Sequence, residues 1–376
     1  MTTDKSILDF LRFCVTHSQD IPDSINQISW QELYDFAKSQ TLIGICFDGI
    51  SRIDNPSIPK PLLYKWMTEA EQLRRQNMHL NLTAGRVFAQ LYKTGFLCCL
   101  LKGQGNTLRY PNPYTRTPGD IDLWVKAPRK EIIKFAKEHF SEMDEINLQH
   151  AGVKKDGVEV ELHFTPSVVC NPIYRHRQQA WFRSQMEEQM NHFVDLPENV
   201  ASICAPTTDF NLVYQICHMQ HHLIDEGLGL RQVVDYYYVL QQAKKENSCL
   251  LRQPGQSQYP LEKLLKHLNL WKFATALMYV MQELFCLSDD MMIAPTHEAR
   301  GKYVLKELLL GGNFGRSDTR YGRFIYQPKY KKYFLKTWRV LHSARYFPEE
   351  CLCEPIFRIY HYGWRLWMNH IKIKEL

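Results

Sequence analysis

Two aspartates separated by a single residue are the side chains of this sequence most suited to chemistry. Asp120 and Asp122 stand at the start of a short apolar run at 121–125. If this run is a β-strand, both carboxylates project from the same face, about 6–7 Å apart along the backbone. Such a pair is either a solvated surface feature or a cation site, because close carboxylates repel each other unless a cation lies between them. Mg²⁺ is commonly held by one or two carboxylates together with substrate phosphates, so the pair predicts a magnesium site.

A third acidic residue is expected from the strand pair that follows. Asp156-Gly157 readily adopts the left-handed angles of a two-residue turn, so it predicts a hairpin of strands at approximately 148–155 and 158–164. Successive strand side chains point to opposite sides. One face of the second strand is therefore apolar, and the other face carries Glu159, Glu161 and His163. Either Glu161 or Glu159 is suitably placed to complete a metal-binding carboxylate cluster.

A turn with two glycines precedes the aspartates, in LLKGQGNTLRYP at 100–111. Gly103 and Gly105 would let the backbone approach a phosphate closely, and a helix starting there would offer free N–H groups to an anion. An ordinary strand-to-helix turn explains the glycines equally well. Lys102 could neutralise phosphate charge or be a solvent-facing charge at a strand end. Arg116 could bind phosphate oxygens through two hydrogen bonds, or could pair with the acids themselves.

Other polar residues are weaker candidates. Arg231 and Asp235 could form a structural ion pair at four-residue spacing on a helix. The segment GGNFGRSDTRYGR could form a second anion site, although a flexible connection between helices is the favoured interpretation. Its arginines are Arg316, Arg320 and Arg323.

Zinc ligands at the usual spacings are not evident. His218, His221 and His222 lie on one predicted helix, and a spacing of four can hold zinc, but no third ligand accompanies them. Core or pocket-lining roles are favoured for these histidines. The 11 cysteines are scattered and form no CxxC pairs at zinc-like spacing, so we expect reduced thiols.

The sequence pattern changes from helical to strand-like and back to helical along the chain, which indicates the elements that must position the predicted site. The first 95 residues read as helical, with a capping pair at Ser29 and Glu32 and an apolar stripe from 62 to 92 that fits one long helix or two stacked ones. Short apolar runs at 96–103 and 121–125 predict buried strands, and 128–140 returns to helical spacing. After about residue 200 the helices are expected at roughly 208–224, 229–243, 258–268, 270–286, 296–309, 330–346 and 354–373.

Composition limits the class of protein. A chain of 376 residues suits two or three compact units, and 45% hydrophobic with 23% charged residues is ordinary for a folded globular protein. No leader pattern and no apolar stretch near 20 residues is present, so we expect a cytoplasmic protein without a membrane partner. The net charge of +6 is modest, which leaves nucleic acid as a possible but not indicated partner.

The order of the motifs resembles the uncharacterised nucleotidyltransferase family of bacteria, within the DNA polymerase beta-like superfamily. The resemblance rests on the strand, the KG turn, a short helix, YP, Arg116, GDIDLWV and VEVELHF, and it covers about residues 30–245. The segment EGLGLRQVVDYY also resembles the family's C-terminal pattern, which implies that Arg231 and Asp235 line the substrate side, as the alternative to a structural pair. It implies an α+β fold with a small mixed nucleotidyltransferase sheet. We expect a helical N-terminal region at 1–95, the nucleotidyltransferase core at 96–200 and an all-helical C-terminal domain at 201–376.

Position by position, Gly103 resembles the turn glycine of the family, Asp120 and Asp122 the metal ligands, and Glu161 the third acid. Glu161 is also a candidate acceptor for the attacking proton. The sequence departs from the wider superfamily at Gln104, where a serine usually follows the glycine. The nucleotide-binding residues expected here are Lys102, Gly103, Gln104 and Arg116.

The resemblance implies transfer of a nucleoside monophosphate from a triphosphate, with ATP expected, to a hydroxyl acceptor with release of pyrophosphate. Two Mg²⁺ ions would serve the reaction, because phosphoryl transfer depends mainly on positioning and charge neutralisation. The acceptor could be a sugar, an antibiotic-like molecule, an RNA end or a protein side chain. The alternative is a non-catalytic binding or regulatory protein of the same fold, in a toxin–antitoxin or polysaccharide-locus context. The presence of all three carboxylates argues against that alternative.

Overall fold

The protein is described here from a computed structural model that covers residues 4–144, 146–252, 258–315 and 329–370. The chain divides into two compact units that interleave along the sequence. Unit 1 comprises Met1–Gln76, Arg109–Thr117 and His222–Arg339, and unit 2 comprises Asn77–Leu108, Pro118–His221 and Val340–Leu376. The consecutive limits expected from the sequence, after residues 95 and 200, stay a prediction.

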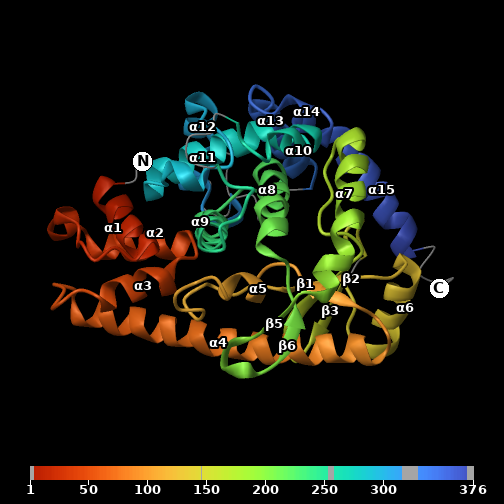
Figure 1. Cartoon of the computed structure of the whole chain (residues 1–376), viewed down its shortest axis with the longest axis horizontal. Helices are drawn as coiled ribbons and strands as arrows, with labels where there is room; N and C mark the ends of the chain where they lie inside the picture. Colours follow the sequence, from red (N-terminus) through yellow and green to blue (C-terminus); the bar gives the residue numbers. More distant parts are fainter. Residues whose placement is uncertain (1–3, 145, 253–257, 316–328, 371–376) are drawn as a thin grey trace. The chain divides into compact units, whose positions relative to one another are not determined.

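Helices make up most of the described chain, and the strands are short (Figure 1). The helices are α1 (Lys5–Thr16), α2 (Trp30–Ser39), α3 (Ile43–Ser51), α4 (Lys60–Lys93), α5 (Gln104–Thr107), α6 (Arg129–His139), α7 (Pro172–Asn191), α8 (Thr208–Asp225), α9 (Leu230–Lys245), α10 (Glu262–His267), α11 (Trp271–Phe285), α12 (Glu298–Gly311), α13 (Lys329–Ser343), α14 (Pro348–Cys351) and α15 (Glu354–His370). The strands are β1 (Cys98–Leu100), β2 (Ile121–Val125), β3 (His150–Lys155), β4 (Val158–His163), β5 (Phe193–Asp195) and β6 (Ser202–Cys204).

The α+β class expected from the sequence is confirmed, and the sheet that carries the acidic residues is mixed. Its strand order is β1-β2-β4-β3. The central pair, β2 and β4, runs parallel, whereas β1 with β2 and β3 with β4 are antiparallel. Strands β5 and β6 form a separate antiparallel pair. In the described part of the chain, every regular element after β6 is helical.

Several local predictions are confirmed because short-range chemistry fixes them. Ser29 caps α2 by accepting a hydrogen bond from the Glu32 N–H. The apolar stripe from 62 to 92 forms the single helix α4, and the run at 121–125 forms β2. Asp156 and Gly157 both have positive φ, at 53° and 77°, as the two-residue turn between β3 and β4 requires.

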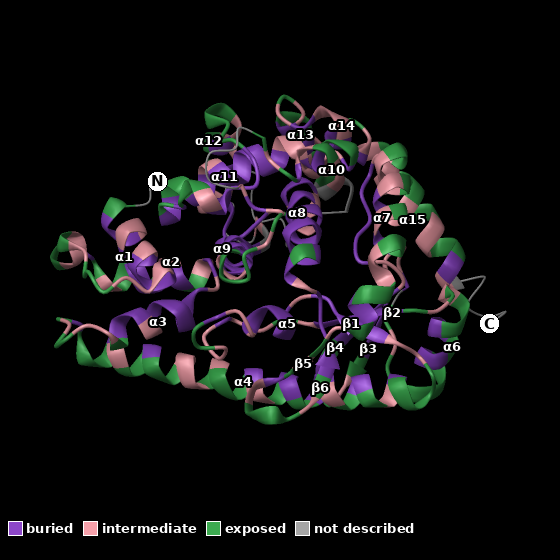
Figure 2. Ribbon diagram, in the orientation of Figure 1, coloured by how far each residue is buried: buried purple, intermediate pink, exposed green. Residues whose placement is uncertain are grey.

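A cluster of aromatic rings packs in the core of unit 2, on the face of β2 that also carries Asp122. Trp124 of β2 is buried and stacks on Phe210 of α8, with ring centroids 6.0 Å apart, and it meets Phe182 of α7 edge to face. Strands β1 and β2 and most of α9 in unit 1 are buried along their lengths (Figure 2), whereas β3 and β4 each carry an exposed residue. The aromatic cluster therefore packs next to the carboxylates, on the same face of the strand.

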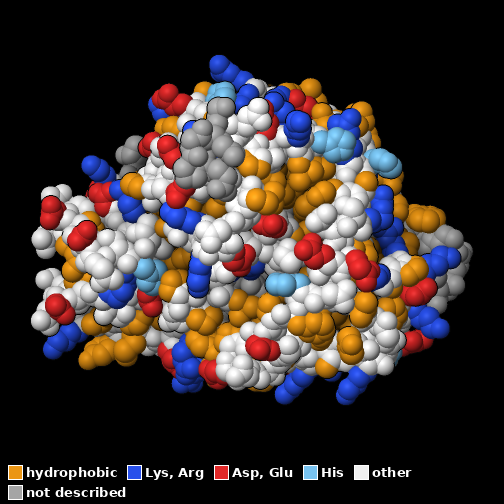
Figure 3. Space-filling model, in the orientation of Figure 1, with side chains coloured by type: hydrophobic (Ala, Val, Ile, Leu, Met, Phe, Trp, Pro, Cys, Tyr) orange, Lys and Arg blue, Asp and Glu red, His pale blue; other side chains and the backbone are white. Residues whose placement is uncertain are grey.

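The helix α7 and the strands β5 and β6 were not anticipated. Sequence reasoning placed no helix and no strand between 165 and 200. The arginines expected as a second anion site, Arg316, Arg320 and Arg323, lie outside the described residues. On the face seen in Figure 3, basic and acidic side chains are interspersed. None of the described helices is long and apolar enough to cross a membrane.

Candidate functional site

The parallel pairing of β2 and β4 brings three carboxylates together in unit 2. The register places Asp122 opposite Glu161, and Asp120 lies one residue before β2. Carboxylate oxygens of Asp120, Asp122 and Glu161 all lie within 4.8 Å of one another. Glu159, the alternative third acid, is exposed and pairs in register with Lys154. It does not belong to this group of described residues, which we call the oxygen set.

Asp122 is the buried member of the oxygen set, with no exposed surface, whereas Asp120 and Glu161 are half-buried. Its Oδ1 lies 3.0 Å from Lys102 Nζ and 2.8 Å from His163 Nε2. Among the described residues, its Oδ2 has no hydrogen-bond partner. A buried carboxylate oxygen without a partner is costly, and a bound cation would satisfy it. The donor set of the three acids therefore fits a hard divalent ion such as Mg²⁺.

Lys102 reaches Asp122 because β1 and β2 are antiparallel neighbours. Leu101, just after β1, donates its backbone N–H to the carbonyl of Asp122 over 3.0 Å, which places the next side chain beside that carboxylate. Burial opposes the charge of the ammonium group, but the carboxylates of Asp122 and Asp120 raise the pKa of Lys102 well above its ordinary value. Lys102 is thus a fixed positive charge at the oxygen set.

His163 lies between the two acids from β2 and β4. Its Nε2 is 2.8 Å from Asp122 Oδ1 and 3.0 Å from Glu161 Oε2, and both carboxylates can only accept hydrogen bonds when ionised. Its Nδ1 is 3.3 Å from the carbonyl oxygen of Thr165, which also accepts. Nε2 therefore donates to the carboxylates, whereas Nδ1 lies near both an acceptor, the Thr165 carbonyl, and a donor, Gln149 Nε2 at 3.4 Å. Burial lowers the pKa of His163, but the hydrogen bonds to Asp122 and Glu161 outweigh it and raise that pKa to about 9.

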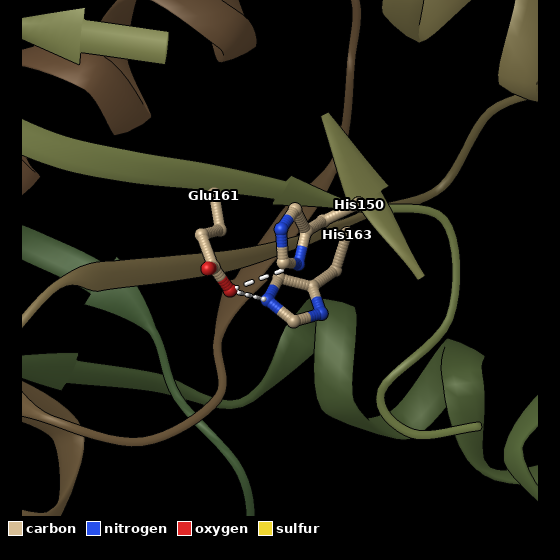
Figure 4. A group of neighbouring side chains, drawn as sticks. All are labelled: His150, Glu161 and His163. Atoms are coloured by element: carbon tan, nitrogen blue, oxygen red, sulfur yellow. Dashed lines mark hydrogen bonds and ion pairs between the residues drawn. The ribbon is translucent and has the colours of Figure 1, made fainter. Parts of the chain in front are cut away.

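Glu161 is shared between two histidines. Its Oε2 lies 3.0 Å from His163 Nε2 and 3.0 Å from Nδ1 of His150, the first residue of β3 (Figure 4). Burial raises the pKa of Glu161, but its contacts with His150 and His163 hold that pKa well below the ordinary value. Glu161 is therefore an anion at neutral pH and cannot serve as an acid there.

His150 was not singled out from the sequence, although the hairpin contains a signal for it. In a hairpin closed by Asp156-Gly157, residues at equal distances from the turn face each other, and His150 pairs with His163 in the register. The two histidines therefore share one face of the sheet with Glu161. Counting outward from the turn would have placed His150 at the site.

The glycine turn next to the acids is conformationally demanding. Gly103 has φ +60°, and a Cβ atom there would lie 3.2 Å from the carbonyl oxygen of Asp120. The backbone of the turn therefore approaches the aspartate strand as only glycine readily permits. The side chain of Gln104 is buried and points elsewhere, donating to Asn81 Oδ1 over 2.6 Å. A contact of this turn with phosphate would thus involve its backbone, while Gln104 holds it in place.

Arg116 belongs to unit 1, where its guanidinium forms a buried ion pair with Asp235 of α9. Nε and Nη2 of Arg116 lie 2.8 and 2.9 Å from the two oxygens of Asp235, and Tyr110 Oη donates to Asp235 Oδ1 over 2.6 Å. Arg231 donates instead to the backbone carbonyl of Thr117. Nε and Nη2 of Arg116, which could bind a phosphate through two hydrogen bonds, therefore already donate to a carboxylate. The nucleotide-binding role expected for Arg116 stays a prediction.

The histidines of α8 belong to neither of the two groups of possible metal ligands found among the described residues. His218 stacks on Tyr214, with ring centroids 6.1 Å apart, and His222 Nδ1 lies 3.7 Å from Glu226 one turn later on the helix. These contacts are those of packing and helix-surface residues.

Comparison with known proteins identifies the family. A family model described as "Uncharacterised nucleotidyltransferase" matches residues 26–285. A crystal structure of an antigenic nucleotidyltransferase-like protein from Paracoccidioides brasiliensis is similar at 17% identity and a TM-score of 0.34, covering 58% of this chain and 95% of that chain. No curated protein sequence matches the chain. Since the family model spans well over half of the sequence, the chain belongs to the family of uncharacterised nucleotidyltransferases.

Proposed function

We propose that this protein transfers a nucleoside monophosphate from a nucleoside triphosphate, ATP in the first instance, to a hydroxyl-bearing acceptor and releases pyrophosphate. The observation that carries the proposal is the convergence of Asp120, Asp122 and Glu161 within 4.8 Å in a member of a nucleotidyltransferase family. We also propose that the protein is cytoplasmic. RNA ends are among the acceptors that offer a hydroxyl.

The oxygen set would hold Mg²⁺, in a two-ion arrangement. When bound, the ions supply charge neutralisation for the phosphates and for the attacking and leaving oxygens. Lys102 adds a positive charge beside Asp122 and is assigned to the triphosphate, together with the backbone of Gly103 and the supporting side chain of Gln104. Because the contacts with His150 and His163 hold the pKa of Glu161 well below its ordinary value, we assign Glu161 to metal binding, and solvent receives the proton of the hydroxyl.

His163 acts as a positioning residue in this proposal. Its imidazolium contacts both Asp122 and Glu161, and so it keeps the acids of β2 and β4 at a fixed separation while no metal is bound. Its positive charge also offsets the repulsion between the two carboxylates.

Incubation of the protein with cell extract and α-labelled nucleoside triphosphates tests the proposal. The expected result is magnesium-dependent transfer of label to an acceptor that the variant Asp120→Asn does not support. Magnesium-dependent triphosphate binding without label transfer, for all four nucleotides and across extracts, would favour the non-catalytic alternative. Absence of both binding and transfer would overturn the nucleotide assignment altogether.

A further inference from the structure

We propose that His150, Glu161 and His163 form a second metal-binding site, for an ion of the zinc class, which shares Glu161 with the oxygen set. One ligand atom from each of these residues lies within 4.8 Å of the others. They come from the paired strands β3 and β4, and both imidazoles approach one carboxylate oxygen (Figure 4). We call this group the histidine set.

The donor atoms of the two sets differ in the ions that they prefer. Imidazole nitrogen suits zinc and other later transition metals, whereas carboxylate oxygen suits magnesium. Two histidines and one glutamate are a ligand combination of zinc sites that keep a coordination position open. The histidine set would therefore select an ion that the oxygen set does not, within the same few ångströms of the sheet.

The surroundings of His163 have the form of a support for a metal ligand. Histidines that bind metals usually donate the hydrogen of the other ring nitrogen to a carbonyl or carboxylate oxygen. His163 Nδ1 lies 3.3 Å from the Thr165 carbonyl oxygen and 3.4 Å from Gln149 Nε2. This arrangement leaves Nε2 facing the carboxylates of Asp122 and Glu161. At β3, Asn147 Nδ2 donates to Nε2 of His150 over 2.7 Å, so Nδ1 carries the ring hydrogen toward Glu161. Zinc binding at Nδ1 would move this hydrogen to Nε2 and open the contact with Asn147.

The position is also favourable for added positive charge. Asp122 and Glu161 both lie within 3.0 Å of His163 Nε2, so two carboxylates already face one point. A zinc ion there would take the place of the proton that Nε2 carries and would add charge to the same point. The side chain of His150 is partly exposed, which gives an ion access from that side.

Because both sets use Glu161, zinc bound at the histidine set should affect the nucleotide site. This expectation rests on the proposed function. A carboxylate engaged by an ion in the histidine set is less available to the oxygen set, so zinc should weaken the binding of Mg²⁺ with triphosphate. Linkage requires the reverse effect to be equal, with Mg²⁺ and triphosphate weakening zinc binding by the same factor. The histidine set would thus make the nucleotide site sensitive to zinc.

Calorimetric titration of the full chain with Zn²⁺, in the absence of nucleotide, tests the site. His150→Ala and the shape-preserving His150→Gln should each raise the Kd for Zn²⁺ by at least about 10-fold. Loss of a residue that only supports a metal ligand already lowers metal affinity by about 10-fold. The matched control is His176→Ala, which removes an exposed imidazole from α7 of the same unit and should leave the Kd unchanged. Co²⁺ in place of Zn²⁺ should give visible bands of nitrogen and oxygen ligation that His150→Ala removes.

Two variants separate this inference from the proposed function. In His150→Ala, zinc binding should be lost, and added Zn²⁺ should no longer reduce the thermal shift produced by Mg²⁺ with triphosphate. In Asp120→Asn, that magnesium-dependent shift should be lost while zinc binding remains. Zinc binding that is equal in His150→Ala and His176→Ala, or a Co²⁺ spectrum dominated by thiolate bands in both, would overturn the second site alone. A magnesium-triphosphate shift that survives Asp120→Asn would instead overturn the proposed function and leave the histidine set standing.

Discussion

One oxygen of Asp122 is contacted by two cationic side chains. Lys102 Nζ and His163 Nε2 both approach Oδ1, at 3.0 and 2.8 Å, inside a site where Asp122 itself has no exposed surface. Asp120 is half-buried and stands at the edge of the same strand. The two aspartates of the motif, equivalent in sequence, therefore have different environments, and their replacement should separate metal binding from stability.

We expect Asp122→Asn to lower the free energy of unfolding by roughly 3–5 kcal/mol, because it leaves buried cations without their partner. Asp120→Asn should change that energy by less than about 0.5 kcal/mol, as is usual for a substitution outside the core, or should increase it slightly. Both variants should lose the rise in melting temperature caused by Mg²⁺ with triphosphate. Urea titration and thermal melts measure the two effects. Retention of the full ligand-induced shift in both variants would refute the metal assignment.

The third acid can be tested by a pair of matched substitutions on β4. Glu161→Gln should abolish turnover and the magnesium-dependent shift, because it removes one charge from the oxygen set. Glu159→Gln serves as the control, since Glu159 is exposed on the same strand and pairs in register with Lys154. Label-transfer assays on the two variants decide the outcome. If Glu159→Gln removes turnover and Glu161→Gln does not, the register of the functional acid is wrong by two residues.

Lys102 should act on triphosphate affinity. Lys102→Ala should weaken triphosphate binding by about 1–3 kcal/mol, the range for loss of a hydrogen bond to a charged group. The loss should be smaller for the corresponding monophosphate, because fewer anionic oxygens then need a cation. Calorimetry with both nucleotides provides the comparison. Equal losses for the two would mean that the ammonium group matters through its ion pair with Asp122 and not through phosphate.

At the scale of elements, sequence reasoning succeeded where the physics is local. The Asp156-Gly157 turn, the Ser29 cap and the apolar period of α4 each follow from a few neighbouring residues, and all appear in the structure. The strands β5 and β6 have three residues each, too few for an alternating pattern to be recognised. Helix α7 is polar around most of its circumference, so its residues lack the apolar stripe that identifies helices.

The candidate site was predictable in part for the same reason. Spacing placed Asp120 with Asp122, and alternation placed Glu161 on the polar face of its strand. The adjacency of β2 and β4 joins segments about forty residues apart, and it is a tertiary property that no local pattern encodes. The contact of His163 with Asp122 depends on that adjacency, and so does the closeness of the Asp122 and Glu161 carboxylates.

The turn before α5 offers a test of how an element positions the site. Gly103→Ala should lower the free energy of unfolding by about 1–3 kcal/mol, because alanine is strained at φ +60°. It should also weaken magnesium-dependent triphosphate binding, since the added Cβ lies 3.2 Å from the Asp120 carbonyl. The control is Gly95→Ala, at φ +87° with open space around it, which should cost stability alone. Equal nucleotide affinities for the two variants would show that the Gly103 turn does not position the aspartates.

At the scale of the whole molecule, the chain passes between its two compact units more than once. Residues 109–117 belong to unit 1, although the segments on either side belong to unit 2. Sequence reasoning divides a chain at changes of composition, and a nine-residue excursion produces no such change. Arg116 illustrates the consequence. Its closeness in sequence to Asp120 suggested a shared site, whereas its ion-pair partner Asp235 belongs to unit 1.

The Arg116–Asp235 pair should therefore contribute to stability. Asp235→Asn should lower the free energy of unfolding by about 3–5 kcal/mol, because the guanidinium is left buried without a counter-charge. Arg116→Met should have a similar cost, and the double variant Arg116→Met with Asp235→Leu should cost less than the sum of the single effects. Urea titration of the four proteins gives the coupling energy, and triphosphate titration of folded Asp235→Asn addresses the predicted phosphate contact. If Arg116 binds phosphate, loosening its bond with Asp235 should tighten triphosphate binding. An unchanged Kd for triphosphate together with a large coupling energy would show that Arg116 stabilises the fold of unit 1. Lys102 would then be the side chain expected to contact the phosphates.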